Sequence, residues 1–206
     1  MRRNNSWLAG LLALLATGTG AQAAEKPVSG EFRYVLIGVD PQTQMITGWF
    51  ESPTEDATQH VCAFLIVGKL GKEESEVLLF HPSTPQNTVK GKIGFESQDG
   101  KLALALTLDS PPTGCALAPA LTSHGTSLFA LIRKGDFKQV RVVSAKKAFF
   151  HKKPQAGSKG KASVVQFSRL RVFEEKEHFV RASFTPAKGK ALQGWIPMGD
   201  LFGLNP

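Results

Sequence analysis

Cysteine and histidine are the residues of this 206-residue chain whose chemistry is most easily recognised from spacing. The five histidines are scattered and show no His-Glu-x-x-His pattern, although distant histidines could still converge on a metal in space. The two cysteines are Cys62 and Cys115, and Cys62 lies in the apolar run 60–67, which is typical of a buried strand. An isolated cysteine pair is more often bonded than free in an oxidising compartment, to which the N-terminal pattern described below would direct the chain. We therefore expect a structural disulfide, with a free catalytic thiol as the alternative.

Other patterns associated with catalysis are incomplete. Residues 125–127 read Gly-Thr-Ser but lack the second glycine of a nucleophile elbow, and residues 157–161 have the wrong spacing for a phosphate loop. Adjacent carboxylates occur at Glu55-Asp56, Glu73-Glu74 and Glu174-Glu175, whereas acid–base catalysis needs two carboxylates held across a cleft. We therefore predict no catalytic residue, no metal ligand and no cofactor, and a binding protein more than an enzyme.

The N-terminus is typical of a secretory signal. Arg2 and Arg3 precede an apolar run over residues 7–16, and residues 21–23 form an Ala-Gln-Ala cleavage pattern. The run is about ten residues long, about half of what a membrane-spanning helix needs. We predict a signal peptide over residues 1–23, cleavage after Ala23 and export as a soluble chain to the periplasm or the medium. A retained N-terminal anchor is the alternative.

Charge is distributed unevenly along the mature chain. Residues 24–130 carry 7 Lys+Arg against 12 Asp+Glu, whereas residues 131–206 carry 16 against 5, a net charge of +11. This asymmetry indicates two units that face different surroundings. Basic domains commonly bind nucleic acid, but an exported protein seldom meets one, so an anionic glycan, phospholipid head groups or an acidic protein are better partners. A solvated basic surface without a partner is the alternative.

Short alternating apolar segments separated by Gly, Pro and Asp predict an all-β chain. Segments 31–38 and 44–51 read as one hairpin. Segments 92–97 and 101–108 read as another, because Asp99-Gly100 between alternating runs is a strong hairpin signal. The even-numbered leucines of 101–108 share one face and are expected in the core. We predict an antiparallel barrel or sandwich over residues 24–134, the choice between the two staying open, and a second domain over residues 135–206.

The second domain carries an ordered set of features. They are Phe149-Phe150-His151, Pro154, Val164-Val165, Gly194-Trp195-Ile196 and Asp200-Leu201. In this order they resemble the bacterial SH3-like family over about residues 138–202, although residues 167–169 read Phe-Ser-Arg where family members often have Gly-Asp before the middle strand. The resemblance implies a five-stranded small barrel. Many relatives bind cell-wall glycan or peptide, and in others the module packs within a larger protein.

Candidate partner contacts lie where a strand of this domain meets a long loop. Phe150, His151, Lys152 and Lys153 occupy that position, where contacts are common. The alternative is one core aromatic residue beside a solvated basic loop. Trp195 is a further candidate contact. The alternative is a core position, which is more common for a tryptophan in a small barrel.

The leading hypothesis from the sequence is a non-catalytic periplasmic binding protein. Its SH3-like domain would contact the cell wall or an envelope protein, in the latter case as an inhibitor or immunity factor against a wall-degrading enzyme or toxin. The alternative is a cell-wall hydrolase or other envelope enzyme that uses the SH3-like domain for targeting. The ligand and the oligomeric state stay open.

Overall fold

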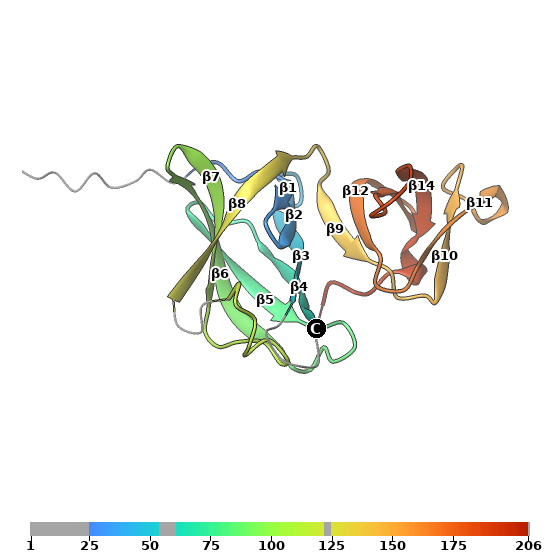
Figure 1. Cartoon of the computed structure of the whole chain (residues 1–206). Helices are drawn as coiled ribbons and strands as arrows, with labels where there is room; N and C mark the ends of the chain where they lie inside the picture. The colour runs from blue at the N-terminus through green and yellow to red at the C-terminus, as the bar shows by residue number, and fades with distance from the viewer. Residues whose placement is uncertain (1–24, 54–60, 122–124, 206) are drawn as a thin grey trace, which may run out of the picture.

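The computed structural model describes residues 25–53, 61–121 and 125–205. This part of the chain forms two antiparallel β units that lie side by side, a barrel and a second sheet (Figure 1). No helix within the described ranges is long and apolar enough to cross a membrane. The prediction of an all-β chain is therefore confirmed.

The first unit is a closed barrel of eight antiparallel strands joined in chain order, and β1 pairs with β8 to close it. Its strands are β1 (Gly30–Phe32), β2 (Val35–Asp40), β3 (Met45–Pro53), β4 (Val61–Lys69), β5 (Glu74–Phe80), β6 (Val89–Gln98), β7 (Lys101–Leu108) and β8 (Gly125–Lys134). A barrel is thus found where a barrel or a sandwich was predicted. The segment predicted as one strand over 31–38 is divided into β1 and β2 by a turn at Tyr34, whose φ is +67°.

The barrel interior is filled by side chains. Phe50 stacks on Phe64 at a centroid distance of 4.7 Å and meets Phe129 edge-on at 5.8 Å. Three of the four predicted core leucines of β7 are buried, and Leu102 packs against the same cluster from a partly buried position. Alternation along the strand therefore places the predicted face of β7 in the core.

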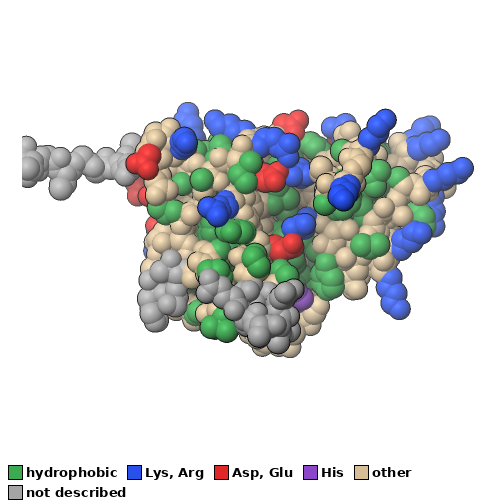
Figure 2. Space-filling view, in the orientation of Figure 1, with side chains coloured by type: hydrophobic (Ala, Val, Ile, Leu, Met, Phe, Trp, Pro, Cys, Tyr) green, Lys and Arg blue, Asp and Glu red, His purple; other side chains and the backbone are tan. Residues whose placement is uncertain are grey.

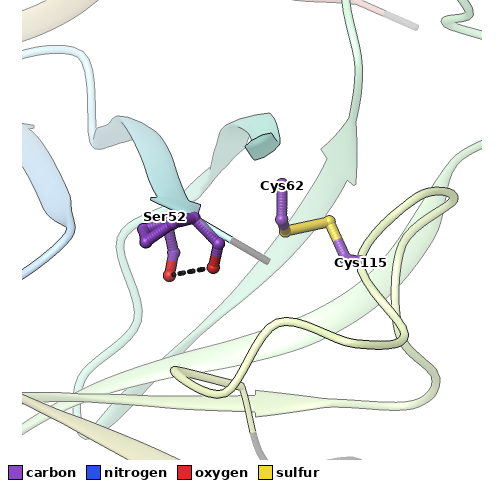
Figure 3. The surroundings of a disulfide bond; sticks show 4 residues. Ser52, Cys62 and Cys115 are labelled. Atoms are coloured by element: carbon purple, nitrogen blue, oxygen red, sulfur yellow. Dashed lines mark hydrogen bonds between the residues drawn. A yellow bond between two sulfur atoms is a disulfide. The ribbon is translucent and has the colours of Figure 1, made fainter. Parts of the chain in front are cut away.

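The predicted disulfide joins Cys62 on β4 to Cys115 in the loop that follows β7 (Figure 3). Both cysteines are buried, and the Cα atoms lie 4.9 Å apart. Ala118 and Leu121 of the same loop pack with the barrel core, so the crosslink ties this loop to the barrel. With both sulfurs bonded, neither cysteine is free in this structure.

The second unit is a six-stranded antiparallel sheet in the order β11-β10-β14-β13-β12-β9. Its elements are β9 (Gln139–Val142), β10 (Lys147–His151), η1 (Ala156–Ser158), β11 (Lys159–Val165), β12 (Arg169–Lys176), β13 (Phe179–Phe184), β14 (Leu192–Pro197) and η2 (Met198–Asp200). The sheet has its own apolar core, which includes Val143, Phe150, Leu170, Val180 and Ile196. The resemblance implied five strands, whereas the sheet has six, with β9 paired to β12 at one edge.

Strand β9 also joins the second sheet to the barrel. Val140 and Val142 pack against Trp49 and Leu65 on the outer face of the barrel. The backbone N–H of Val140 donates a buried hydrogen bond to Thr47 Oγ1 at 2.8 Å. The two units therefore share an apolar interface in addition to their separate cores.

Candidate functional site

A groove of about 350 Å³ lies along the boundary between the barrel and the second sheet. Acidic and basic side chains gather along this boundary in Figure 2. The residues that define this boundary groove are Glu31, Tyr34, Glu51, Ile132, Arg133, Arg169 and Arg171. The first five belong to the barrel and the last two to β12, so the groove exists only when both units are in place.

Arginine–glutamate pairs cross the boundary groove. Glu31 Oε2 accepts hydrogen bonds from Nη2 of Arg133 at 2.8 Å and from Nη2 of Arg171 at 3.1 Å. Glu51 Oε2 lies 3.1 Å from Nη1 of Arg169 and accepts a hydrogen bond from the Trp49 indole at 3.0 Å. Three guanidinium groups thus face two carboxylates, which leaves the groove with an excess of one positive charge.

Apolar side chains form part of the groove wall. Ile132 is 66% exposed and Tyr34 is 37% exposed. The positive φ of Tyr34 is unusual for a bulky residue. A backbone conformation of this kind is kept only where the surrounding structure stabilises it. Guanidinium donors beside exposed apolar surface are suited to recognise an anion that carries an apolar neighbour.

A second candidate surface lies on β10, β11, the loop between them and the residue that precedes β10. Its exposed residues, called the lysine-rich edge below, are Lys146, Lys147, Lys152, Lys153, Lys159 and Lys161. Lys159 Nζ lies 3.8 Å, and Lys147 Nζ 5.1 Å, from the centre of the Phe149 ring. Lys and Arg side chains gather at the end of the second sheet away from the barrel in Figure 2. Within the described residues, none of these six lysines forms an ion pair.

The arginines of the C-terminal region behave differently from its lysines. The five arginines after residue 130 are Arg133, Arg141, Arg169, Arg171 and Arg181. Each of them pairs with a glutamate. Among the described residues, none of the eleven lysines of the same region does so. Because Arg133 and Arg171 share Glu31, the five arginines are matched by four glutamates, and lysine carries most of the positive charge that no ion pair neutralises.

The structure distributes the predicted contact residues between core and surface. Phe150 is 3% exposed and lies in the core of the second sheet. His151 is 7% exposed, its Nδ1 lies 3.1 Å from the carbonyl oxygen of Gln155, and its ring meets Phe179 edge-on. Because Phe150 and His151 are buried, Lys152 and Lys153 are the predicted contact residues of this segment that a partner can reach.

Trp195 is half-buried on β14, opposite His151 of β10. Part of its surface is therefore exposed on the strand next to β10. The predicted cleavage site at Ala23 lies outside the described residues, as do His60, His124 and the Glu55-Asp56 pair.

The remaining titratable candidates are dispersed. Within the described ranges, no group of three His, Cys, Asp or Glu side chains could hold a metal ion. Partial burial lowers the pKa of His81, whose ring lies between Trp49 and Phe167 at the boundary of the two units. Burial also lowers the pKa of Arg141, an effect that its ion pair with Glu175 opposes.

Sequence reasoning did not single out the boundary groove. Arg169 and Arg171 stand two positions apart on a predicted strand, which places them on one face, and that spacing was the available signal. Their partners Glu31 and Glu51 lie more than a hundred positions away in the chain. Nothing in the local sequence of either segment indicates that the four side chains meet.

Comparison of the chain with protein-family models, with curated proteins and with solved structures gave no match. What the boundary groove and the lysine-rich edge can bind is therefore inferred from their own side chains. Both surfaces offer cationic groups beside apolar ones, and both favour an anionic partner.

Proposed function

We propose that this protein is an exported, non-catalytic binding protein of the cell envelope, located in the periplasm or secreted. Its second sheet is proposed to be an SH3-like module that contacts the cell wall or an envelope protein. The N-terminal signal pattern supports export, and the Cys62–Cys115 disulfide fits an oxidising compartment.

The lysine-rich edge is the observation that carries this proposal. Surface lysines are often paired or simply solvated, but here six exposed lysines lie on β10, β11, the loop between them and the residue before β10, without a carboxylate partner in the described structure. Their ammonium groups keep their full attraction for an external anion. Phe149 adds an aromatic ring beneath two of them. An anionic polymer of the cell wall fits such an edge better than a neutral ligand does.

Co-sedimentation of the purified protein with cell-wall sacculi at low and high salt tests this function. Attraction between exposed charges is screened within about 3 Å at 1 M salt. We expect strong binding at low salt, and a fraction that survives high salt if ring and backbone contacts contribute. Absence of binding at both salt concentrations would reject wall binding. It would favour a protein partner, and the protein would then be an inhibitor or immunity factor.

Two variants with the same change in net charge separate a specific edge from a general cationic effect. The first replaces four lysines of the edge with glutamine: Lys152, Lys153, Lys159 and Lys161. The control replaces four exposed lysines of the barrel with glutamine: Lys69, Lys72, Lys90 and Lys101. We expect the first variant to lose most low-salt binding and the control to keep it. Equal losses would mean that net charge alone drives the attraction.

A further inference from the structure

We propose that the boundary groove is a separate binding site for an acidic peptide segment. In this site the carboxylate of an Asp or Glu side chain is held by Arg169 and Arg171, and a neighbouring apolar side chain packs on Tyr34 and Ile132. The site is distinct from the lysine-rich edge, because it is built from both units and uses arginine in place of lysine.

The arginine donors of the groove are not exhausted by the protein's own glutamates. A guanidinium group carries five N–H donors. Within the described structure, Arg171 uses one terminal nitrogen on Glu31 and the other on Thr185 Oγ1, at 3.1 and 3.0 Å. Among the described residues, the partner of Arg169 is Glu51, which it contacts through Nη1, and the Arg169 side chain is 44% exposed. An incoming carboxylate can therefore be bound without displacing either glutamate.

The positions of the two arginines suit a carboxylate. Residues two apart on a strand point to the same face and lie about 6 to 7 Å apart along it. Arg169 and Arg171 therefore present neighbouring guanidinium groups to the groove. The Arg171 side chain is only 18% exposed, and partial removal from water strengthens its interaction with an anion. The excess positive charge of the groove adds to this attraction.

The apolar wall favours a peptide over a sugar or a simple anion. A sugar ring prefers the open flat face of an aromatic side chain, whereas the guanidinium carbon of Arg33 lies 5.3 Å from the centre of the Tyr34 ring and covers one of its faces. Ile132 provides aliphatic surface next to the charges, and Pro186 lines the facing side. A groove of about 350 Å³ has room for a few residues of extended chain.

Titration of the full-length purified protein with two short peptides tests this site. The probes are acetyl-Leu-Glu-Leu-amide and its glutamine counterpart, acetyl-Leu-Gln-Leu-amide, followed by calorimetry and by tryptophan fluorescence. Trp49 reports on the groove because its indole donates to Glu51. We expect the glutamate peptide to bind at least about tenfold more tightly than the glutamine peptide. Equal affinities, or no binding of the glutamate peptide at millimolar concentration, would overturn the proposal.

A matched pair of variants locates the binding. Arg169→Gln removes a groove arginine, and Arg181→Gln removes an arginine that pairs with Glu174 outside the groove at nearly the same exposure, 46% against 44%. We expect about tenfold weaker peptide binding for Arg169→Gln and less than a twofold change for Arg181→Gln. If Arg169→Gln does not fold, Ile132→Ser serves in its place, since this side chain is exposed, and the same loss is expected.

Two further outcomes separate this site from other ligands. Binding of glucuronate without binding of the glutamate peptide would overturn the proposal in favour of a glycan site. The variant without the four lysines of the lysine-rich edge is expected to bind the peptide as the wild type does. Loss of peptide binding in that variant would move the site to the lysine-rich edge and overturn the proposal, whatever the result with sacculi.

Discussion

The contact between β2 and β9 depends on the absence of a side chain at Gly38. A Cβ atom at this position would lie 2.6 Å from Cα of Gln139, and the three nearest atoms all belong to the Gln139 backbone. Real Cβ atoms essentially never approach backbone so closely, so the Gly38→Ala change must push β9 away from the barrel. The displaced strand carries Val140, whose N–H donates the buried hydrogen bond to Thr47.

The expected cost of Gly38→Ala follows from two terms. Overpacking of a well-packed contact costs about 1 to 3 kcal/mol, and an unsatisfied buried N–H costs about 1 to 3 kcal/mol. We therefore expect the free energy of unfolding to fall by about 2 to 6 kcal/mol, measured by urea unfolding with tryptophan fluorescence. Trp49 lies in the same interface, so its emission should also shift to longer wavelength in the folded variant.

Gly94→Ala is the matched control for this change. Gly94 also lies on a barrel strand, but a Cβ atom there would have its nearest neighbours at 3.9 Å, an ordinary van der Waals contact. We expect its stability to change by less than about 1 kcal/mol, since alanine fits where the backbone and the space allow it. If Gly38→Ala were as stable as Gly94→Ala, β9 would not be held against the barrel as described, and the groove built on that contact would lose its support.

Two further predictions concern the crosslink and the boundary histidine. Joint Cys62→Ser and Cys115→Ser replacement should lower the free energy of unfolding by about 4 kcal/mol, because the bond closes a loop of 53 positions; a variant that stays as stable in urea unfolding would contradict a structural crosslink. The pKa of His81 is lower in the folded state than in the unfolded chain. As the pH falls below about 6.5, the unfolded chain therefore takes up a proton at His81 before the folded protein does. The free energy of unfolding decreases from that pH until the pH reaches the folded-state pKa. Relative to His81→Phe, which keeps a ring between Trp49 and Phe167, the wild type should therefore lose stability as the pH falls below about 6.5. A stability difference between the two proteins that does not change with pH would contradict this prediction.

Local signals predicted the parts of the fold that local geometry determines. Asp99 and Gly100 have φ values of +51° and +73°, as a two-residue hairpin turn requires, and both residue types adopt them readily. The register of β6 and β7 follows directly from that turn. Tyr34 also adopts a positive φ, but nothing in its residue type announces a turn. The division of the first predicted strand was therefore missed.

Long-range pairing explains most of what the sequence could not predict. Whether eight alternating strands close into a barrel or split into two sheets depends on β1 meeting β8, about a hundred positions away. Alternation specifies which face of each strand is buried but not which strand is its neighbour. The same holds for β9, because Val140 and Val142 read as ordinary core residues and give no sign that their core is shared with the barrel.

The arginines and the lysines of the basic C-terminal region have different roles in the structure. Arginine has a planar group with five fixed donors, which suits pairing within a partly buried boundary, and all five arginines of the region pair with glutamate there or nearby. Lysine has a compact, strongly hydrated charge on a flexible stem, which costs more to immobilise in an ion pair. A count of charges gives the two types equal weight. We therefore expect substitution of the edge lysines to weaken co-sedimentation with sacculi without changing the free energy of unfolding, whereas Arg169→Gln should weaken peptide binding in the boundary groove and leave co-sedimentation unchanged.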